Sequence, residues 1–181
     1  MITKYSNAIG VLGGSFDPPH MGHLKISKIS LKKLKLQKIY WVITKQNPLK
    51  KKPYLSLNER IKKCKIILKN NKKIELKYLD AKIKSSRSIR LLKYLKSRNK
   101  DKKIFLIIGS DNLINFHRWL NWKKILNFCE LVVFSREGFD QKARKSATVK
   151  YSRNKHIIFV KNRKIDISST KLRKYYKKKN N

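Results

Sequence analysis

The sequence contains no long apolar run. No stretch of its 181 residues approaches the roughly 18–20 apolar residues that a membrane-spanning helix needs. The amino terminus, MITKYSNAIG, has no apolar run ahead of a small-residue cleavage site, so we expect no secretory signal. These absences favour a cytoplasmic protein. We expect one domain over residues 1–181, with a Lys/Asn-rich tail at 177–181 that frays.

Cysteine is scarce as well. Cys64 and Cys129 are the only two, and each lies in a segment with a helical pattern. Neither has a second Cys or a His at the spacing of metal ligands. We therefore expect two buried free thiols rather than a disulfide.

Acidic residues are few, 10 against 48 Lys and Arg, which gives a formal net charge of +38. Such a charge ordinarily suggests a nucleic-acid or anionic-membrane partner. Here Lys supplies 38 and Arg 10 of the basic residues, and they spread over nearly every segment instead of clustering beside aromatics. We interpret the charge chiefly as compositional bias on solvated helix faces, with a weak general affinity for polyanions as the alternative. We expect no specific nucleic-acid partner and no membrane partner.

Short apolar, β-branched runs alternate with longer helical patterns. The predicted strands are Ala8–Leu12, Ile39–Thr44, Lys73–Tyr78, Ile104–Ile108, Leu131–Phe134 and His156–Val160. Runs this short and apolar indicate parallel strands buried on both faces. We predict an α/β fold with a single Rossmann-like, doubly wound, mostly parallel sheet and helices on both faces. Ligands then bind at the carboxyl ends of the strands.

Helical patterns fill the intervals between the strands. One begins near Gly22, and a second follows Ser56, whose Ser-x-x-Glu box with Glu59 marks its start. The remaining predicted helices are the face from Ile89 to Leu95, capped by Ser86 or Ser88, then Trp119–Phe128 and Thr170–Lys178. The candidate long loops are Gln46–Leu55 and Glu137–Asn154.

The first strand ends in a Gly-rich turn with two histidines, GGSFDPPHMGHL from Gly13 to Leu24. Glycines let the backbone approach an anion closely, and the free N–H groups of a helix amino terminus point at phosphate oxygens. His20 lies just before the helix and His23 in its first turn, so both imidazoles face one phosphate and can stabilise developing charge. The alternatives are a metal pair or two surface histidines, and we assign no protein-bound metal.

Three further sets of residues are candidates. Ser168, Ser169 and Thr170 place hydroxyls at a helix start with Arg173 one turn later, which suits a triphosphate or is a plain cap with a solvated Arg. Gly109 and Asp111 follow a strongly apolar strand, where a carboxylate accepts ribose hydroxyls or caps a helix. Trp119 and Trp122 are ring-stacking or core residues.

The turn resembles the nucleotidyltransferase superfamily with the His-x-Gly-His signature, and ISSTKLR resembles its second signature, Ser-Ser-Thr-x-x-Arg. Gly-x-Asp-Asn-Leu at 109–113 and Phe-His-Arg-Trp at 116–119 resemble the bacterial nicotinate-nucleotide adenylyltransferases. The resemblance implies that an acceptor phosphate attacks the α-phosphorus of ATP directly, with Mg²⁺ carried by the ATP. It implies nicotinate mononucleotide as acceptor, and deamido-NAD and pyrophosphate as products.

By this resemblance the roles divide into three groups. The catalytic residues are His20, His23 and Arg173. The ATP-binding residues are Gly13, Gly14, Ser15, Phe16, Gly22, Gly109, Asp111, Ser168, Ser169 and Thr170. The acceptor-binding residues are Asn47, Lys50, Ser88 and Trp119, with Trp119 stacking on the pyridine ring and Trp122 left to packing.

Two departures from the family pattern concern the acceptor. Ser86-Arg87-Ser88 stands where the family carries Tyr-Thr, so Ser88 takes the place of the Thr hydroxyl and Arg87 is a candidate for the nicotinate carboxylate. Arg136-Glu137-Gly138 replaces Arg-Pro-Gly.

Two rival functions are weighed against this activity. One rival is phosphopantetheine adenylyltransferase, which shares the first turn but lacks Phe-His-Arg-Trp. The other is a basic RNA-binding protein, which accounts for the charge but not for the motifs.

Overall fold

Six strands form a single sheet in the computed structural model, which describes residues 7–161, 169, 172 and 173. They are β1 (Ala8–Gly14), β2 (Lys38–Ile43), β3 (Ile74–Tyr78), β4 (Lys103–Gly109), β5 (Glu130–Phe134) and β6 (Ile157–Val160). Each coincides with a predicted strand to within two residues at either end. All five pairings are parallel, which confirms the doubly wound α/β fold.

The strand order is β3-β2-β1-β4-β5-β6. The chain winds outward from β1 to β3, then returns to β4 on the other side of β1. The order therefore reverses between β1 and β4, and a crevice opens outside the carboxyl ends of these two strands. In open α/β sheets this is where ligands bind.

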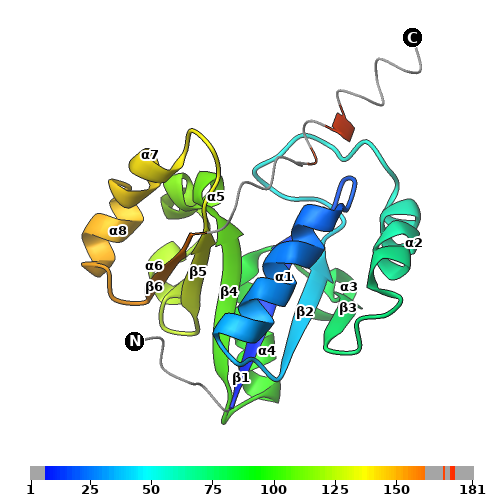
Figure 1. Ribbon diagram of the computed structural model, residues 1–181, viewed down its shortest axis with the longest axis horizontal. Helices are drawn as coiled ribbons and strands as arrows, with labels where there is room; N and C mark the ends of the chain where they lie inside the picture. The colour runs from blue at the N-terminus through cyan, green and yellow to red at the C-terminus, as the bar shows by residue number, and fades with distance from the viewer. Residues whose placement is uncertain (1–6, 162–168, 170–171, 174–181) are drawn as a thin grey trace.

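Helices cover both faces of the sheet, and Figure 1 shows α1 in front of it and α4 behind. One apolar layer packs under α1 (Met21–Lys33) and α2 (Leu57–Leu68). The other packs under α4 (Ser88–Arg98), α5 (Ser110–Ile114), α6 (Trp122–Ile125), α7 (Asp140–Arg144) and α8 (Ala147–Ser152). Strand β4 shows why its sequence is a continuous apolar run: Leu106 faces one layer and Ile107 the other.

The two predicted helix starts at strand ends are confirmed. α1 begins at Met21 with His20 as its N-cap residue. α2 follows Ser56, whose Oγ accepts the Glu59 N–H at 3.3 Å, while Glu59 Oε2 accepts the Ser56 N–H at 2.8 Å. This reciprocal box satisfies two of the four donors that a helix start leaves free.

Three local predictions are wrong. α4 has Arg87 as its N-cap residue with no side-chain cap bond, so neither Ser86 nor Ser88 caps it. The predicted helix Trp119–Phe128 is instead a 3₁₀ turn at Phe116–Arg118, an extended Trp119 and the four-residue α6. The predicted loop Glu137–Asn154 contains α7, α8 and the buried side chains of Ala143 and Val149. The short four- to six-residue helices give too few turns for a helical periodicity to show.

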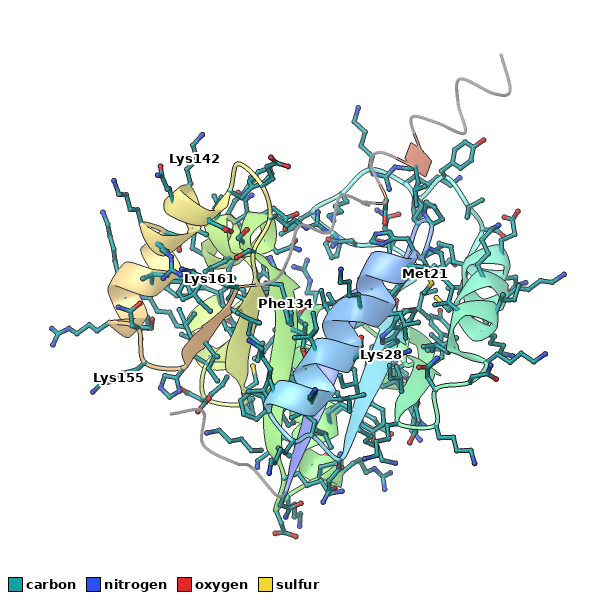
Figure 2. All side chains as sticks on the ribbon, viewed as in Figure 1. Met21, Lys28, Phe134, Lys142, Lys155 and Lys161 are labelled. Atoms are coloured by element: carbon teal, nitrogen blue, oxygen red, sulfur yellow. The ribbon has the colours of Figure 1, made fainter. Side chains whose placement is uncertain are left out.

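Lys142 and Lys155 are exposed, and both cysteines are buried. Lysines such as Lys142 and Lys155 extend away from the ribbon in Figure 2. Cys64 and Cys129 are buried free thiols, and burial raises the pKa of each to about 12. Within the described part of the chain, no helix is both long and apolar enough to cross a membrane. The predicted helix Thr170–Lys178 and the tail at 177–181 lie largely or wholly outside the described residues.

Candidate active site

A cavity of about 1070 Å³ lies at the carboxyl ends of the strands. The turn after β1, the long loop after β2, the segment before α4 and the ends of β4 and β5 all contribute to its wall. Of the residues predicted for the site, it is lined by Gly13, Gly14, Ser15, Phe16, His23, Asn47, Lys50, Ser88, Gly109, Asp111, Trp119, Ser169 and Arg173. His20 and Gly22 are buried in the adjoining start of α1 and do not line it.

The Gly-rich turn leaves room at the cavity wall. A methyl group at Gly13 would meet no described atom within 4 Å, so the protein's own packing does not require this glycine. A glycine there keeps the backbone open to a ligand. Phe16 adopts a left-handed φ of 48°, which is uncommon for a bulky residue. It is held there by burial and by stacking on Trp41, with the ring centroids 5.0 Å apart.

The two histidines lie against each other with ring centroids 3.8 Å apart. The backbone N–H of His20 donates to His23 Nδ1 at 3.2 Å. Because Nδ1 accepts, the neutral His23 carries its proton on Nε2, where it can donate to a ligand. Both ring nitrogens of His20 are buried and have no hydrogen-bond partner among the described residues. A buried unsatisfied pair of this kind is expected where a ligand supplies the partner.

Both imidazoles are neutral at pH 7 in this structure. Desolvation, and then the positive charge of Arg136, lower the pKa of His20 to about 4. Desolvation also lowers the pKa of His23 far below its usual range, with further contributions from His20 and Arg136. The cavity side of α1 is thus a place where positive charge is costly before an anion binds.

Asp111 lies at the end of β4, as predicted. Its Oδ2 is 3.3 Å from Arg136 Nη1, and its Oδ1 is buried with no described partner. A Cβ at Gly109 would overlap Asp111 Oδ1 and lie 3.0 Å from Arg136 Nε, so a larger residue there would displace the Asp111 and Arg136 side chains. Arg136 also lines the cavity. In the sequence Arg136 stands out only as part of a departure from the family pattern. Its position just after β5 nevertheless places it at the edge of the sheet where ligands bind.

The second signature reaches the first turn through Ser169 and Arg173. Ser169 Oγ donates to the Pro18 carbonyl at 2.9 Å, and Arg173 Nη1 donates to the Asp17 carbonyl at 2.5 Å. Two segments about 150 residues apart in sequence therefore meet at one wall of the cavity. Ser168 and Thr170 lie outside the described residues.

The predicted acceptor residues Asn47, Lys50, Ser88 and Trp119 also line the cavity. Trp119 is partly buried and packs on Phe116 at 4.9 Å between ring centroids, and it shares the cavity wall with Arg87 and Ser88. Trp122 packs between Phe116 and Tyr151 and does not line the cavity. Asn47 Oδ1 accepts the Leu49 N–H at 2.9 Å, so it shapes the loop as well as lining the cavity.

Lys50 is an exposed residue, yet partial desolvation of its ammonium group lowers its pKa. The positive charges of Arg136 and Arg173 lower it further, while Asp111 opposes them. Lys50 therefore lies within electrostatic reach of groups on the ATP side as well as the acceptor side. These three cations make the cavity suited to a strongly anionic ligand.

A buried arginine that belongs to none of the predicted motifs lies beneath the site. Arg60 is 2% exposed, and its guanidinium donates to the carbonyls of Ser15 at 2.6 Å, Thr44 at 2.8 Å and Lys45 at 3.0 Å. Its Nε donates to Leu55 and Ser56. A signal was present: in a chain whose solvated charges are mostly Lys, an Arg marks a place where a planar, many-donor group is needed.

No group of three or more His, Cys, Asp or Glu side chains in the described ranges could hold a metal ion. The carboxylates near the cavity are individually committed: Asp17 and Asp80 accept backbone N–H groups, and Asp111 pairs with Arg136. A divalent cation in the site would need other oxygen ligands, which phosphates supply.

This cavity and fold define a class of protein that binds nucleotides at the switch point of a doubly wound sheet. The family model described as Cytidylyltransferase-like matches residues 11–175, so the chain belongs to the cytidylyltransferase-like family. A protein of Pelagibacter ubique named "Probable nicotinate-nucleotide adenylyltransferase" is 47% identical over 96% of each chain. A protein of the same name from Fusobacterium nucleatum is 39% identical over 94% of this chain and 88% of its own. The chain is thus a member of the nicotinate-nucleotide adenylyltransferase family.

Solved structures agree on the fold. A nicotinic acid mononucleotide adenylyltransferase of Plasmodium falciparum, solved in complex with NaAD, matches with a TM-score of 0.74. The match covers 93% of this chain and 83% of that chain at 23% identity. At this identity the likeness concerns the fold alone.

Proposed function

We propose that this protein transfers the adenylyl group of ATP to nicotinate mononucleotide, giving deamido-NAD and pyrophosphate, a step of NAD biosynthesis. The observation that carries the proposal is the convergence of both signatures on one cavity. His23 from the first turn, Asp111 from the end of β4 and Arg173 from the second signature all line it, together with Trp119.

The geometry suits direct transfer with both substrates bound together. A volume of about 1070 Å³ is at the upper end of the range for sites that hold one drug-sized ligand, roughly 300–1000 Å³. A cavity of this size has room for both nucleotide substrates at once. The reaction needs no covalent nucleophile, because positioning and charge stabilisation carry phosphoryl-type transfers. The acceptor's phosphate oxygen attacks the α-phosphorus of ATP and pyrophosphate leaves.

The catalytic roles follow from where each donor lies. His23 offers its Nε2–H toward the phosphates because His20 N–H occupies Nδ1. His20, whose ring nitrogens have no partner among the described residues, is proposed to donate its one N–H to a phosphate oxygen that reaches the start of α1. Arg173, Ser169 and, by resemblance, Thr170 and Ser168 bind the outer phosphates and the departing pyrophosphate. Mg²⁺ belongs to the proposal as the ion carried by ATP, held by the triphosphate oxygens and lending them charge neutralisation.

The acceptor-binding roles are assigned to four other residues that line the cavity. Trp119 offers a ring face to the pyridine ring, and the start of α4, with Ser88 and Arg87, faces the same space. Asn47 and Lys50 are proposed to lie against the acceptor's phosphate. A cytoplasmic location and a single domain over 1–181 stay part of the proposal.

Pyrophosphate release tests the function directly. The protein is mixed with Mg-ATP at moderate salt and given nicotinate mononucleotide, nicotinamide mononucleotide or phosphopantetheine in turn. Release that is strongest with nicotinate mononucleotide supports the proposal. Release only with phosphopantetheine would keep the chemistry and change the acceptor, and no release with any of the three would refute the enzyme.

Salt dependence separates the enzyme from a protein that binds RNA through its charge. Turnover of mononucleotides involves few phosphate contacts and should decline modestly as salt rises. Binding driven by many lysines should weaken about a thousandfold or more between low and moderate salt. Tight, steeply salt-dependent RNA binding without turnover would favour the RNA-binding function.

A further inference from the structure

Asp17 lies in the first turn and holds the far end of the loop after β2. Its side chain is 6% exposed. Oδ1 accepts the Leu55 N–H at 2.9 Å and Oδ2 accepts the Tyr54 N–H at 2.8 Å. Hydrogen bonds from two successive N–H groups to one buried carboxylate are charge-assisted and directional. The end of the loop is therefore fixed relative to the Gly-rich turn.

The same residue meets the second signature. Arg173 Nη1 donates to the Asp17 carbonyl at 2.5 Å and lies 3.7 Å from Oδ2. Asp17 thus contacts the loop that carries Asn47 and Lys50 on one side and the arginine proposed for the triphosphate on the other. The negative charge of Asp17 also offsets the desolvation of Arg60, so the buried carboxylate acts electrostatically on two guanidinium groups.

The near end of the loop has its own anchor. Asp80 Oδ2 accepts Thr44 Oγ1–H at 2.7 Å and the Lys45 N–H at 2.8 Å. With both ends fixed, the placement of Asn47 and Lys50 depends on the distance between the two carboxylate anchors. Of the two carboxylates, only Asp17 belongs to the Gly-rich turn and contacts Arg173. Arg60 ties the near end of the loop to that turn as well, because it donates to the carbonyls of Ser15, Thr44 and Lys45.

We propose that Asp17 is a positioning residue. Its carboxylate holds the acceptor loop and Arg173 in fixed positions relative to each other, so that the acceptor side and the ATP side of the site form together. This inference rests on the proposed function, which assigns the loop to the acceptor and Arg173 to ATP. Asp17 is not proposed as a reacting group, because both of its carboxylate oxygens already interact with Tyr54, Leu55 and Arg173.

Asp17→Asn is the informative substitution because it keeps the size of the side chain. The amide has one acceptor oxygen, so it can accept one of the two N–H groups and turns its own NH₂ toward the other. It also loses the charge that faces Arg173. Asp101→Asn is the matched control, since Asp101 is exposed and lies just before β4, at the opposite end of that strand from the cavity.

Steady-state kinetics separate positioning from mere support of the fold. We expect Asp17→Asn to raise KM for nicotinate mononucleotide at least tenfold, to raise KM for ATP and to lower kcat, with Asp101→Asn within twofold of the unmodified protein. A residue that only supports the fold would lower the active fraction and leave both KM values unchanged. That result, or KM values within twofold for both substrates, would overturn the inference.

Amide hydrogen exchange tests the anchor without turnover. The Tyr54 and Leu55 amides should exchange at least tenfold faster in Asp17→Asn than in the unmodified protein, and unchanged rates would overturn the inference. If Asp17→Asn does not fold, Asp17→Glu, which keeps the charge but displaces the oxygens, takes its place in both experiments. Absence of turnover by the unmodified protein would count against the proposed function alone, and the exchange rates would then decide the role of Asp17.

Discussion

Replacing Arg60 by Met should lower the free energy of unfolding by about 3–4 kcal/mol, which is a large share of the roughly 5–15 kcal/mol that stabilises a typical domain. Arg60 is 2% exposed and donates to five carbonyls. Ser56 O keeps the Arg60 backbone N–H at 3.1 Å, and Lys45 is exposed enough for water to replace the lost donor. The loss therefore falls mainly on Ser15 O, Thr44 O and Leu55 O.

The magnitude follows from those three acceptors. These three residues are half-buried, so each acceptor left without its donor costs somewhat more than about 1 kcal/mol, in the lower part of the range for unsatisfied groups. Met recovers part of the packing that the Arg stem provides. A total of about 3–4 kcal/mol also agrees with the range of roughly 3–5 kcal/mol for breaking a buried charged network. For a chain of this length it corresponds to a fall in Tm of about 10 °C.

Urea unfolding followed by circular dichroism measures the effect, with Arg90→Met as the control because Arg90 is exposed on α4. We expect Arg90→Met to stay within about 0.5 kcal/mol of the unmodified protein, as surface substitutions do. Arg60→Lys should lie between the two, because it restores the charge but not the fork of donors. A loss below about 1 kcal/mol for Arg60→Met would refute the assignment of these hydrogen bonds as structural.

Three more predictions concern the cavity. His23→Ala should lower kcat by roughly a hundredfold or more, which is the cost of removing one preorganised donor. His117→Ala, at an exposed position, should leave kcat unchanged. Near-normal turnover by folded His23→Ala would exclude a catalytic role for His23. Trp119→Ala should raise KM for the acceptor about tenfold, the effect of losing about 1–1.5 kcal/mol of ring stacking, and leave ATP binding by calorimetry unchanged, whereas Trp122→Ala should mainly lower Tm. Because the pKa of His20 is about 4 in the fold against 6.5 unfolded, the unfolded state binds more protons between these values, and stability should fall by about 3 kcal/mol from pH 7 to pH 4. His20→Gln should flatten this part of the pH profile of urea unfolding, and an unchanged slope would contradict the burial of a neutral His20.

The fold was largely readable from the sequence because its signals are periodic and strong. The run at Ile104–Ile108 is apolar at every position since both faces of β4 are covered, and such runs are typical of parallel strands. Apart from the cap of α4, the errors fall on α6, α7 and α8, which span four to six residues. Elements of one turn are stabilised by contacts distant in sequence, such as the packing of Trp122 on Tyr151, and periodicity carries no trace of them.

The candidate site was readable only where a local motif carries it. The turn from Gly13 to His23 is continuous in sequence, so its place at the end of β1 followed from the strand assignment. Arg60, Asp17 and Arg136 act through partners 25 to 156 positions away. No spacing rule predicts such pairs, and they become visible only when the sheet order brings the ends of β1, β2, β4 and β5 to one edge.

The charges around the two histidines link substrate binding to their protonation. Arg136 lowers the pKa of both imidazoles, and Lys50 adds to the effect at His23. A triphosphate bound among these cations brings negative charge to the same place, which raises the pKa of a nearby imidazole. His23 already donates from Nε2 when neutral, and a raised pKa would let His20 carry protons on both ring nitrogens. The strongest donors would therefore form only when the nucleotide is present, which keeps uncompensated positive charge out of the buried start of α1 in the empty site.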